Sequence, residues 1–306
     1  MATSEKVRIG WIGTGVMGLP MCGHLLDAGH EVHVSSRTRE RAAPLVERGA
    51  HWHDTPAAAA AESDCVCTMV GYPSDVREVV LGPSGVLAGT RPGTLLVDLT
   101  TSEPSLAEEI HAQAGRGEVD ALDAPVSGGD VGARNATLVI MVGGTPEAFA
   151  RARPVLDVMG RSVVHAGGPG AGQHTKMMNQ IAIASGMIGL CEALVYAARS
   201  GLDVERAVDT IAGGAAGSWS LSNYGPRALR GDFAPGFKIE HFLKDLRIAL
   251  AESRRMGLTM PGLALAEELY ARAEQQGLGG RGTHALVLAL AETSGVAWEP
   301  AGARPL

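Results

Sequence analysis

The spacing of apolar residues along the chain changes near residue 166. Up to residue 166, short runs of β-branched and other apolar residues alternate with segments of helical periodicity. The β-like runs read VRIGWIG, EVHVSS, DCVCTMV, TLLVDL, EVDALDAPVS, TLVIMVGG and SVVHAGG. Strands that alternate with helices are typical of βαβ units, which assemble into a parallel sheet with helices on both faces. The pattern therefore predicts a doubly wound α/β domain over residues 1–166.

From residue 167 onward, the apolar positions recur only at helical spacing. The segments that predict helices are 173–199, 203–212, 238–256, 261–276 and 282–293. Between two of them, the sequence GSWSLSNYGPRAL indicates an inter-helix loop that carries Trp219. We therefore expect an all-α domain over residues 167–306, with the boundary in the glycine-rich sequence AGGPGAG.

The first of these helices contains an apolar stretch, Ile181 to Ala198, that is about long enough to span a bilayer. Its Gly, Ala and Ser residues, the carboxylate of Glu192 and the lack of a second such stretch favour a buried helix over a membrane span. A helix this apolar has to be covered by another domain or another subunit. We expect no membrane partner, and we expect a homo-oligomer.

Charge and cysteine content exclude several classes of partner. The net charge is −7 and no run of Lys or Arg is present, which argues against a nucleic-acid partner. The four cysteines are scattered without a CxxC pair, which favours free thiols in a reducing compartment and gives no sign of a metal site. The N-terminal sequence MATSEKVRIGWIG has no secretory hydrophobic region, so the expected location is cytoplasmic.

A glycine pattern follows the first β-like run. Gly13, Gly15 and Gly18 form GxGxxG within IGTGVMG, directly before a helical segment and the second strand. Such glycines allow a tight turn, close approach of the backbone to a pyrophosphate and packing of the helix on the strand. In this context the pattern predicts a Rossmann-type domain that binds a dinucleotide.

The end of the second strand is expected to meet the adenosine ribose. An acidic residue there usually binds both ribose hydroxyls of NAD, but this chain has Ser35, Ser36, Arg37 and Thr38. The Arg37 guanidinium is suited to pair with a 2′-phosphate, so NADP(H) is preferred over NAD(H). The alternative is that Arg37 is a solvated loop residue, which leaves the preference undecided.

One lysine has an unusual setting. Between Arg161 and Glu192, Lys176 is the only residue charged at neutral pH, histidines aside. Removing an ammonium group from water costs several kcal/mol unless something compensates. Lys176 therefore either faces water or takes part in chemistry.

Four stretches together carry a family resemblance. They are IGTGVMG, the sequence DAPVSGGDVGA from Asp123 to Ala133, GAGQHTKMMNQ from Gly170 to Gln180, and HFLKDLRIAL at 241–250. In this order they resemble the β-hydroxyacid dehydrogenase family, over nearly the whole chain. Its members include 3-hydroxyisobutyrate dehydrogenase, tartronate semialdehyde reductase, and glyoxylate and succinic semialdehyde reductases, and they commonly form dimers or tetramers.

The resemblance implies roles for individual residues. Lys176 is the expected general acid/base, supported by Asn179. The expected loop position of Trp219, independently of the resemblance, makes it a candidate for lining the substrate pocket, and a place in the core is the alternative. Burial and a nearby helix N-terminus are expected to favour the neutral amine of this lysine. The substrate carboxylate is expected at Ser127, Gly128 and Gly129. The cofactor is expected at Gly13, Thr14, Gly15, Val16, Met17, Gly18, Ser36, Arg37, Thr38, Val70, Gly71, Thr101 and Lys244.

Two departures from the family pattern bear on these roles. The family often has Asn four residues after the lysine, whereas this chain has Asn179 at plus three and Gln180 at plus four. Both spacings place an amide on the face of the helix that carries the lysine, so the choice stays open. Ala136 also stands where the family frequently has Gly, which puts the loop after the carboxylate site and the substrate identity in question.

The expected function is hydride transfer between a nicotinamide cofactor and a small β-hydroxy acid or its semialdehyde. An imine reductase is one alternative, but such enzymes typically have another residue at the position of Lys176. A cofactor-binding regulatory module without turnover is the second alternative. The presence of the lysine, the SGG loop and the KDL sequence together argues against both.

Overall fold

The computed structural model describes residues 6–298. The chain forms two compact units that meet between Lys176 and Met177, and we refer to them as the N-terminal unit and the helical unit. One long helix, α9 (Ala171–Arg199), contributes its first turns to the N-terminal unit and the remainder to the helical unit.

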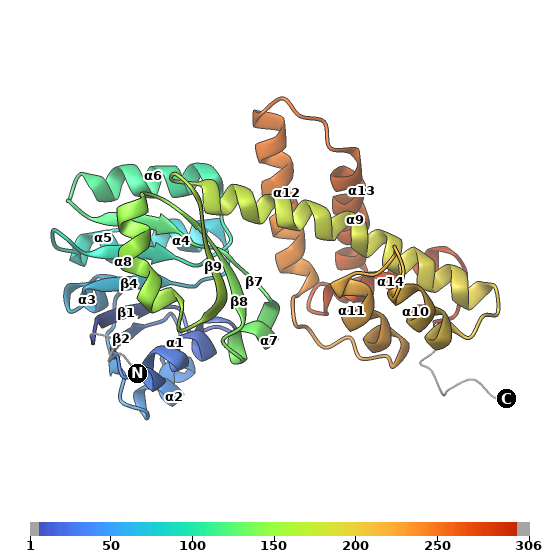
Figure 1. Cartoon of the computed structure of the whole chain (residues 1–306), viewed down its shortest axis with the longest axis horizontal. Helices are drawn as coiled ribbons and strands as arrows, with labels where there is room; N and C mark the ends of the chain where they lie inside the picture. The colour runs from blue at the N-terminus through green and yellow to red at the C-terminus, as the bar shows by residue number, and fades with distance from the viewer. Residues whose placement is uncertain (1–5, 299–306) are drawn as a thin grey trace. The chain divides into compact units, whose positions relative to one another are not determined.

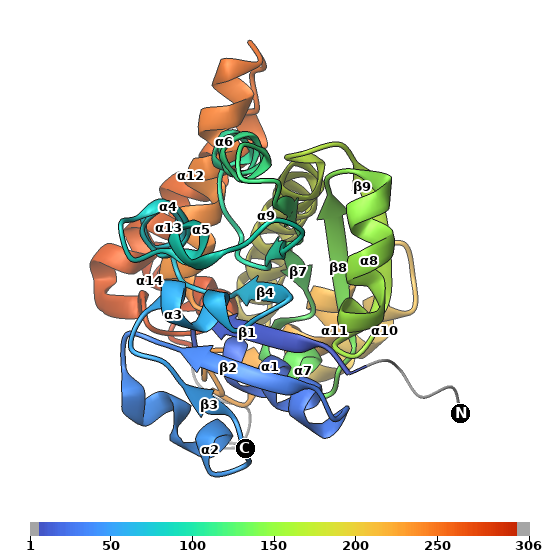
Figure 2. The same ribbon diagram turned by 90° about the vertical axis from the view of Figure 1, so that its left-hand side faces the viewer.

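The N-terminal unit is built on a nine-stranded sheet with the order β3-β2-β1-β4-β5-β6-β8-β7, and β9 pairs with β8 (Figures 1 and 2). The pairings from β3 to β6 are parallel, whereas β8 runs antiparallel to both β6 and β7. The sheet is thus parallel, as expected, except around β8. The strands are β1 (Arg8–Ile12), β2 (Glu31–Ser35), β3 (His51–Trp52), β4 (Cys65–Thr68), β5 (Leu95–Asp98), β6 (Asp120–Asp123), β7 (Val126–Ser127), β8 (Leu138–Gly143) and β9 (Gly160–Gly167).

Two apolar cores cover opposite faces of this sheet. Cys65 and Cys67 of β4 belong to one core, while Val66 belongs to the other, as the alternation of side chains along a strand requires. Helices α1 and α8 pack in the first core, and α4 and α6 pack in the second. The doubly wound prediction is therefore confirmed. The helical segments are α1 (Gly18–Asp27), η1 (Arg39–Ala42), α2 (Ala43–Val46), α3 (Pro56–Ala61), α4 (Pro73–Leu81), α5 (Val86–Gly89), α6 (Pro104–Gly115), α7 (Gly129–Arg134) and α8 (Pro146–Leu156).

The helical unit consists of the greater part of α9 and the elements that follow it. Its described residues contain helices, turns and a single isolated bridge between Lys238 and Gly282, so the all-α prediction is confirmed for them. Its core includes Phe242, whose ring meets the Tyr270 ring edge to face at 5.0 Å. The elements are α10 (Val204–Ala212), α11 (Trp219–Leu229), α12 (Ile239–Arg255), α13 (Pro261–Ala273), η2 (Glu274–Leu278), η3 (Thr283–Ala285) and α14 (Leu286–Thr293).

The prediction of an inter-helix loop around Trp219 is wrong, because this segment forms α11. Ser218 caps the helix, since its Oγ accepts a hydrogen bond from the Leu221 N–H at 3.0 Å. Leu221, Ala228 and Leu229 are buried on one face. Two serines, a glycine and Pro226 conceal this periodicity in the sequence.

Helix α9 is the one helix in the described part of the chain that is long and apolar enough to cross a membrane. Length and composition alone are weak evidence, because the core helix of a globular unit passes the same test. Ala184, Met187, Cys191 and Leu194 of α9 are all buried in the core of the helical unit. This packing accounts for the apolar residues on the buried face of the helix.

Candidate functional site

The glycine-rich turn joins β1 to α1. Gly13 has φ +99°, and a Cβ atom there would overlap the Met69 carbonyl oxygen. A Cβ atom at Gly18 would overlap the Gly13 carbonyl oxygen. At Gly15, by contrast, an added Cβ would have no heavy atom of the described residues within 4 Å. The fold itself thus requires Gly13 and Gly18, while Gly15 leaves space for a ligand to approach the backbone.

This turn is held to the end of β2. The Gly13 N–H donates to the Ser35 carbonyl at 2.9 Å, and the Thr14 hydroxyl donates to Ser36 Oγ at 2.9 Å. Thr14 is buried, Met17 is half-buried and Val16 is 68% exposed. The open glycine position and the N-terminus of the ten-residue helix α1 fit the diphosphate of a dinucleotide, which binds to amide donors at such a site.

Arg37 lies just past β2, with its side chain 87% exposed. Its Nη1 atom is 3.7 Å from Asp75 Oδ1 on α4, and Thr38 is half-buried at the start of η1. Asp75 lies 38 residues after Arg37 in the chain, so no local sequence pattern predicts this contact. Because the carboxylate also accepts the Tyr72 N–H at 3.1 Å, it has a local capping role that the sequence PSDV indicates.

The carboxyl ends of β4 and β5 supply the other residues expected at the cofactor in this unit. Val70, Gly71 and Thr101 are half-buried there. The Val70 N–H donates to Thr100 Oγ1 at 3.0 Å, which ties the two strand ends together. In open α/β sheets ligands bind beyond the carboxyl ends of the strands, so these positions fit a dinucleotide.

The loop from Ser127 to Gly129 joins β7 to α7. Gly128 has φ +132° and Gly129 has φ +62°, conformations that residues with side chains rarely adopt. Ser127 is half-buried and Gly128 is exposed. A hydroxyl and backbone amides at a bend of this kind are suited to a carboxylate.

After this loop, Ala136 has φ +53°. The chain therefore keeps a left-handed conformation that favours glycine at the position where the resemblance leads one to expect it.

Lys176 lies near the start of α9 and belongs to the N-terminal unit. The residue is 7% exposed, which does not fit a lysine that simply faces water. The same unit thus contains the glycine turn, the strand ends, the Ser127–Gly129 loop and a buried lysine.

In the helical unit, a chain of polar contacts links α9 to α12. Asn179 Nδ2 donates to Gln180 Oε1 at 2.7 Å, and Gln180 Nε2 donates to Asp245 Oδ2 at 2.6 Å. Lys244 Nζ is 3.0 Å from Asp245 Oδ1. Gln180 is 1% exposed and Asn179 is half-buried. Gln180 therefore serves the contact between two helices, which favours Asn179 as the amide available to a substrate.

Trp219 is the first residue of α11 and is 62% exposed, so it is not a core tryptophan. Its ring meets the Tyr224 ring edge to face at 5.2 Å.

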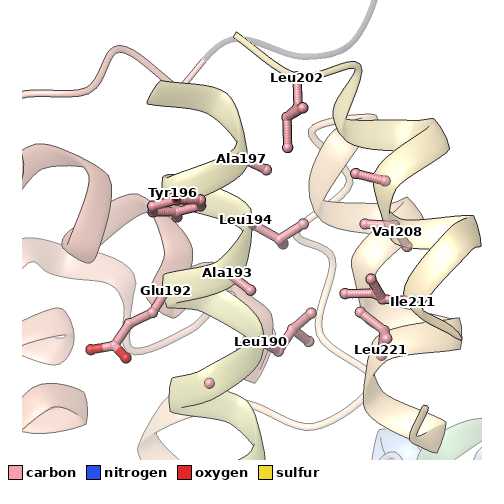
Figure 3. Close-up of a pocket in the computed structure, with 12 residues that line it drawn as sticks. Leu190, Glu192, Ala193, Leu194, Tyr196, Ala197, Leu202, Val208, Ile211 and Leu221 are labelled. Atoms are coloured by element: carbon pink, nitrogen blue, oxygen red, sulfur yellow. The ribbon is translucent and has the colours of Figure 1, made fainter. Parts of the chain in front are cut away.

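A separate apolar hollow of about 450 Å³ lies between the second half of α9 and the helices α10 and α11 (Figure 3). Leu190 and Leu194 point toward Val208, Ile211 and Leu221, and none of the residues expected at the site lines this hollow.

Sequence-family models match both parts of the chain. Residues 8–168 match the NAD binding domain of 6-phosphogluconate dehydrogenase. Residues 170–290 match a domain described as the NAD-binding domain of NADP-dependent 3-hydroxyisobutyrate dehydrogenase.

Individual relatives agree with these models. The chain is 52% identical to a probable 3-hydroxyisobutyrate dehydrogenase-like protein of Arabidopsis thaliana, over 96% of this chain and 88% of that one. It is 36% identical to 2-hydroxy-3-oxopropionate reductase of Escherichia coli, over 86% and 90% of the two chains.

Solved structures extend the comparison. The 3-hydroxyisobutyrate dehydrogenase of Mycobacterium tuberculosis, solved with L-serine, superposes with a TM-score of 0.86 at 34% identity, over 94% of this chain and 99% of that one. An imine reductase from Pseudomonas sp. shares the fold at 17% identity, with a TM-score of 0.56 over 94% and 100% of the two chains. The chain belongs to the β-hydroxyacid dehydrogenase family, whose members are NAD(P)-dependent oxidoreductases that act on CH–OH groups.

Proposed function

We propose that the enzyme oxidises a small β-hydroxy acid, or reduces the matching semialdehyde, with Lys176 as the general acid/base. The observation that carries this proposal is a lysine only 7% exposed, in the same unit as the dinucleotide turn and the Ser127–Gly129 loop. The names of the Arabidopsis and Escherichia coli relatives support a substrate of this class.

The chemistry divides between the cofactor and the chain. The nicotinamide supplies the hydride acceptor for oxidation and the hydride donor for reduction. In oxidation the neutral Lys176 amine takes the proton of the substrate hydroxyl, and in reduction its ammonium returns that proton to the carbonyl oxygen. Asn179, three residues further along α9, shares a face of the helix with Lys176 and orients the reacting oxygen.

The substrate carboxylate accepts hydrogen bonds from the Ser127 hydroxyl and from the backbone amides of Gly128 and Gly129. This contact holds one end of the substrate while Lys176 holds the reacting oxygen. Two points of contact present one face of the reacting carbon for hydride transfer.

NADP(H) is the preferred cofactor in this proposal. Arg37 supplies a guanidinium at the end of β2, and residues 35–38 contain no carboxylate. The matched family domain is described as that of an NADP-dependent enzyme, and a structural relative at 29% identity and TM-score 0.85 was solved with NADP⁺.

The test is nicotinamide absorbance against a panel of β-hydroxy acids and their semialdehydes, with NADP(H) and NAD(H) in parallel. We expect turnover that falls roughly 10²- to 10⁴-fold in Lys176→Ala, as for loss of a general acid/base. Lys6→Ala, at an exposed lysine outside the site, should match the wild type. Turnover of a cyclic imine but of no hydroxy acid would transfer the assignment to imine reduction. Tight NADPH binding without any turnover would indicate a regulatory module.

We further propose that the protein is a homo-oligomer, a dimer or tetramer. Helix α9 exposes Met178 by 68% and Tyr196 by 74%, with the small exposed residues Gly186 and Gly189 between them. An exposed apolar helix face is costly in water. Light scattering at micromolar concentration should give a multiple of the 31.6 kDa chain mass, and the mass of a single chain would contradict the proposal.

A further inference from the structure

We propose that Asp123 and Gln173 are positioning residues that fix the first turn of α9, and with it Lys176, to the sheet at the carboxyl ends of β5 and β6. The inference rests on the proposed role of Lys176, and it is carried by hydrogen bonds that none of the expected site residues explains.

The start of α9 has no capping side chain of its own. Helices usually begin at Ser, Thr, Asp or Asn, but here the preceding sequence is GGPG, and the first turn contains no acidic residue. The missing cap comes from β6, whose last residue is Asp123. Its Oδ1 atom accepts the Gly170 N–H and its Oδ2 atom accepts the Gln173 N–H, both at 2.8 Å.

These two amides are the ones that a capping box satisfies, the N–H of the residue before the helix and the N–H three residues later. A capping box uses two side chains of the helix itself. Here one carboxylate, 47 and 50 residues away in the chain, accepts both bonds. The helix start is therefore attached to the sheet as well as capped.

Gln173 makes a second attachment through its side chain. Its Oε1 atom accepts the Ser102 N–H at 2.9 Å, and its Nε2 atom donates to the Thr100 carbonyl at 2.7 Å. Gln173 is fully buried, and Ser102 and Thr100 are each 1% exposed. The two contacts flank Thr101, one of the residues expected at the cofactor, so the same side chain joins the helix to the segment after β5.

The backbone is closely packed around these contacts. A Cβ atom at Gly172 would lie 2.6 Å from the Asp123 carbonyl oxygen, and one at Gly143 would lie 2.7 Å from the Gly172 nitrogen. Helix α9 thus begins in direct contact with the backbones of β6 and β8, and the attachments hold it there.

Lys176 follows Gln173 by three residues, which is slightly less than one helical turn and about 4.5 Å along the axis. A helix whose first turn is fixed at two points can neither rotate nor slide by much. Lys176 therefore takes its place relative to the strand ends from Asp123 and Gln173. Such placement is valuable, because a shift of about 1 Å in a reacting group costs roughly 10²-fold in rate.

The charge state of Asp123 supports this arrangement. Burial raises the pKa of its carboxyl group to about 6, while the amides of Gln173 and Gly170 act in the opposite direction. At neutral pH the carboxyl group is ionised, so both oxygens act as acceptors.

The test compares Asp123→Asn and Gln173→Met with the wild type. Asn keeps the shape of Asp but replaces one acceptor by an NH₂ group, and Met removes the polar atoms of Gln173 while nearly keeping its length. We expect kcat to fall roughly 10- to 100-fold, with KM and the dissociation constant of NADPH changed by less than about threefold. Thr55→Ala is the matched control, because Thr55 Oγ1 caps α3 through the Ala58 N–H at 3.1 Å and takes no part in the site.

Two readouts do not depend on turnover. In both variants the peptide spanning 168–176 should exchange its amide hydrogens faster, and the rate at which acetic anhydride acylates Lys176, followed by mass spectrometry, should change at least threefold. An unchanged acylation rate in folded variants, or a normal kcat despite faster exchange, would overturn the proposal. If Asp123→Asn does not fold, Gln173→Met decides alone, because it leaves both bonds to Asp123 in place.

A double variant separates this inference from the proposed function. If the attachments act through Lys176, adding Gln173→Met to Lys176→Ala should lower the residual rate by less than about threefold. A full additional loss would assign Gln173 a role independent of the lysine and would overturn the proposal. A wild-type enzyme without turnover on any hydroxy acid would refute the proposed function, and the acylation rates would still decide whether Asp123 and Gln173 position Lys176.

Discussion

Ala136 has a left-handed backbone conformation at a position where the family frequently has glycine. The φ of +53° is one that glycine adopts freely and that costs a residue with a Cβ roughly 1–2 kcal/mol. Alanine at this position is therefore less favourable for stability than glycine would be. In the proposed carboxylate-binding loop, by contrast, Gly128 and Gly129 both have positive φ values and both are glycine.

The proposed preference for NADP(H) depends on a single side chain, that of Arg37. Replacing it with alanine should raise KM for NADP roughly tenfold, as for loss of one charge-assisted hydrogen bond worth about 1.5 kcal/mol, and should leave KM for NAD within twofold. Asp75→Asn should act in the opposite direction, because the Asp75 carboxylate is 3.7 Å from Arg37 and would repel a 2′-phosphate. The measurement is initial rate against cofactor concentration.

Arg41→Ala provides the control for this prediction, because Arg41 is an exposed arginine four residues further along the chain. An equal rise of KM for NADP and NAD in Arg37→Ala would show that Arg37 contacts a part of the cofactor common to both. No change with either cofactor would mean that Arg37 is the solvated loop residue of the alternative interpretation.

At the scale of elements, local sequence patterns were sufficient to predict a helix or strand wherever the segment determines its own structure. Spacing within a few residues predicts the GxGxxG turn, the strands β1, β2, β4 and β5, and the helices α9, α10, α12, α13 and α14. Helix α11 was missed because Pro226 and Gly225 interrupt its sequence, although the Ser218 cap signals its start. The antiparallel direction of β8 could not be foreseen, because it depends on pairing between strands rather than on either sequence.

The residues of the candidate site also differ in whether local sequence predicts them. The short sequence stretches around Gly13, Gly18 and Lys176 are enough to single out these residues. The attachment of Gln173 to Thr100 and Ser102, and the use of Gln180 by Asp245, join residues between 65 and 73 positions apart. No local spacing predicts such pairs, and the pair with Asp245 engages the side-chain amide of Gln180.

Two glycines of α9 should respond in opposite ways to the same substitution. An alanine at Gly172 would overlap the Met141 carbonyl oxygen, so Gly172→Ala should destabilise the protein by several kcal/mol or prevent folding. Gly186 lies on the exposed face of the same helix, with no heavy atom of the described residues within 4 Å of an added Cβ. Gly186→Ala should stabilise the separate chain by about 0.5–1 kcal/mol through helix propensity, so the comparison is made at a protein concentration below that at which light scattering shows the oligomer.

Urea unfolding followed by circular dichroism measures both effects. Gly186→Ala serves as the control, because the chemical change is identical and only the contact differs. Similar free energies of unfolding for the two variants would show that α9 does not begin in contact with β6 and β8.

At the scale of the whole molecule, the buried Asp123 should impose a pH dependence on stability. Its pKa rises from the ordinary value of 3.8 to about 6 in the folded protein, chiefly by burial and to a lesser extent through Asp98. Between these two values the folded state binds more protons than the unfolded state, so the free energy of unfolding falls as pH rises. The stabilising effect of the protonated group is complete below pH 3.8 and is lost as pH rises through about 6.

Asp123→Asn cannot titrate at this position, so the difference in unfolding free energy between wild type and variant isolates the effect. From pH 4 to pH 7 that difference should shift against the wild type by an amount on the order of 2–3 kcal/mol. Asp232 affects the pH dependence of stability in the opposite direction, because its hydrogen bond from Arg227 lowers its pKa to about 2. Wild type and variant both contain Asp232, so its effect cancels in the difference. A difference that is constant over this pH range would mean that Asp123 titrates as it does in the unfolded chain. The same carboxylate thus reduces stability at neutral pH while it holds the start of α9, which is the expected cost of placing a buried charged acceptor beneath the helix that carries Lys176.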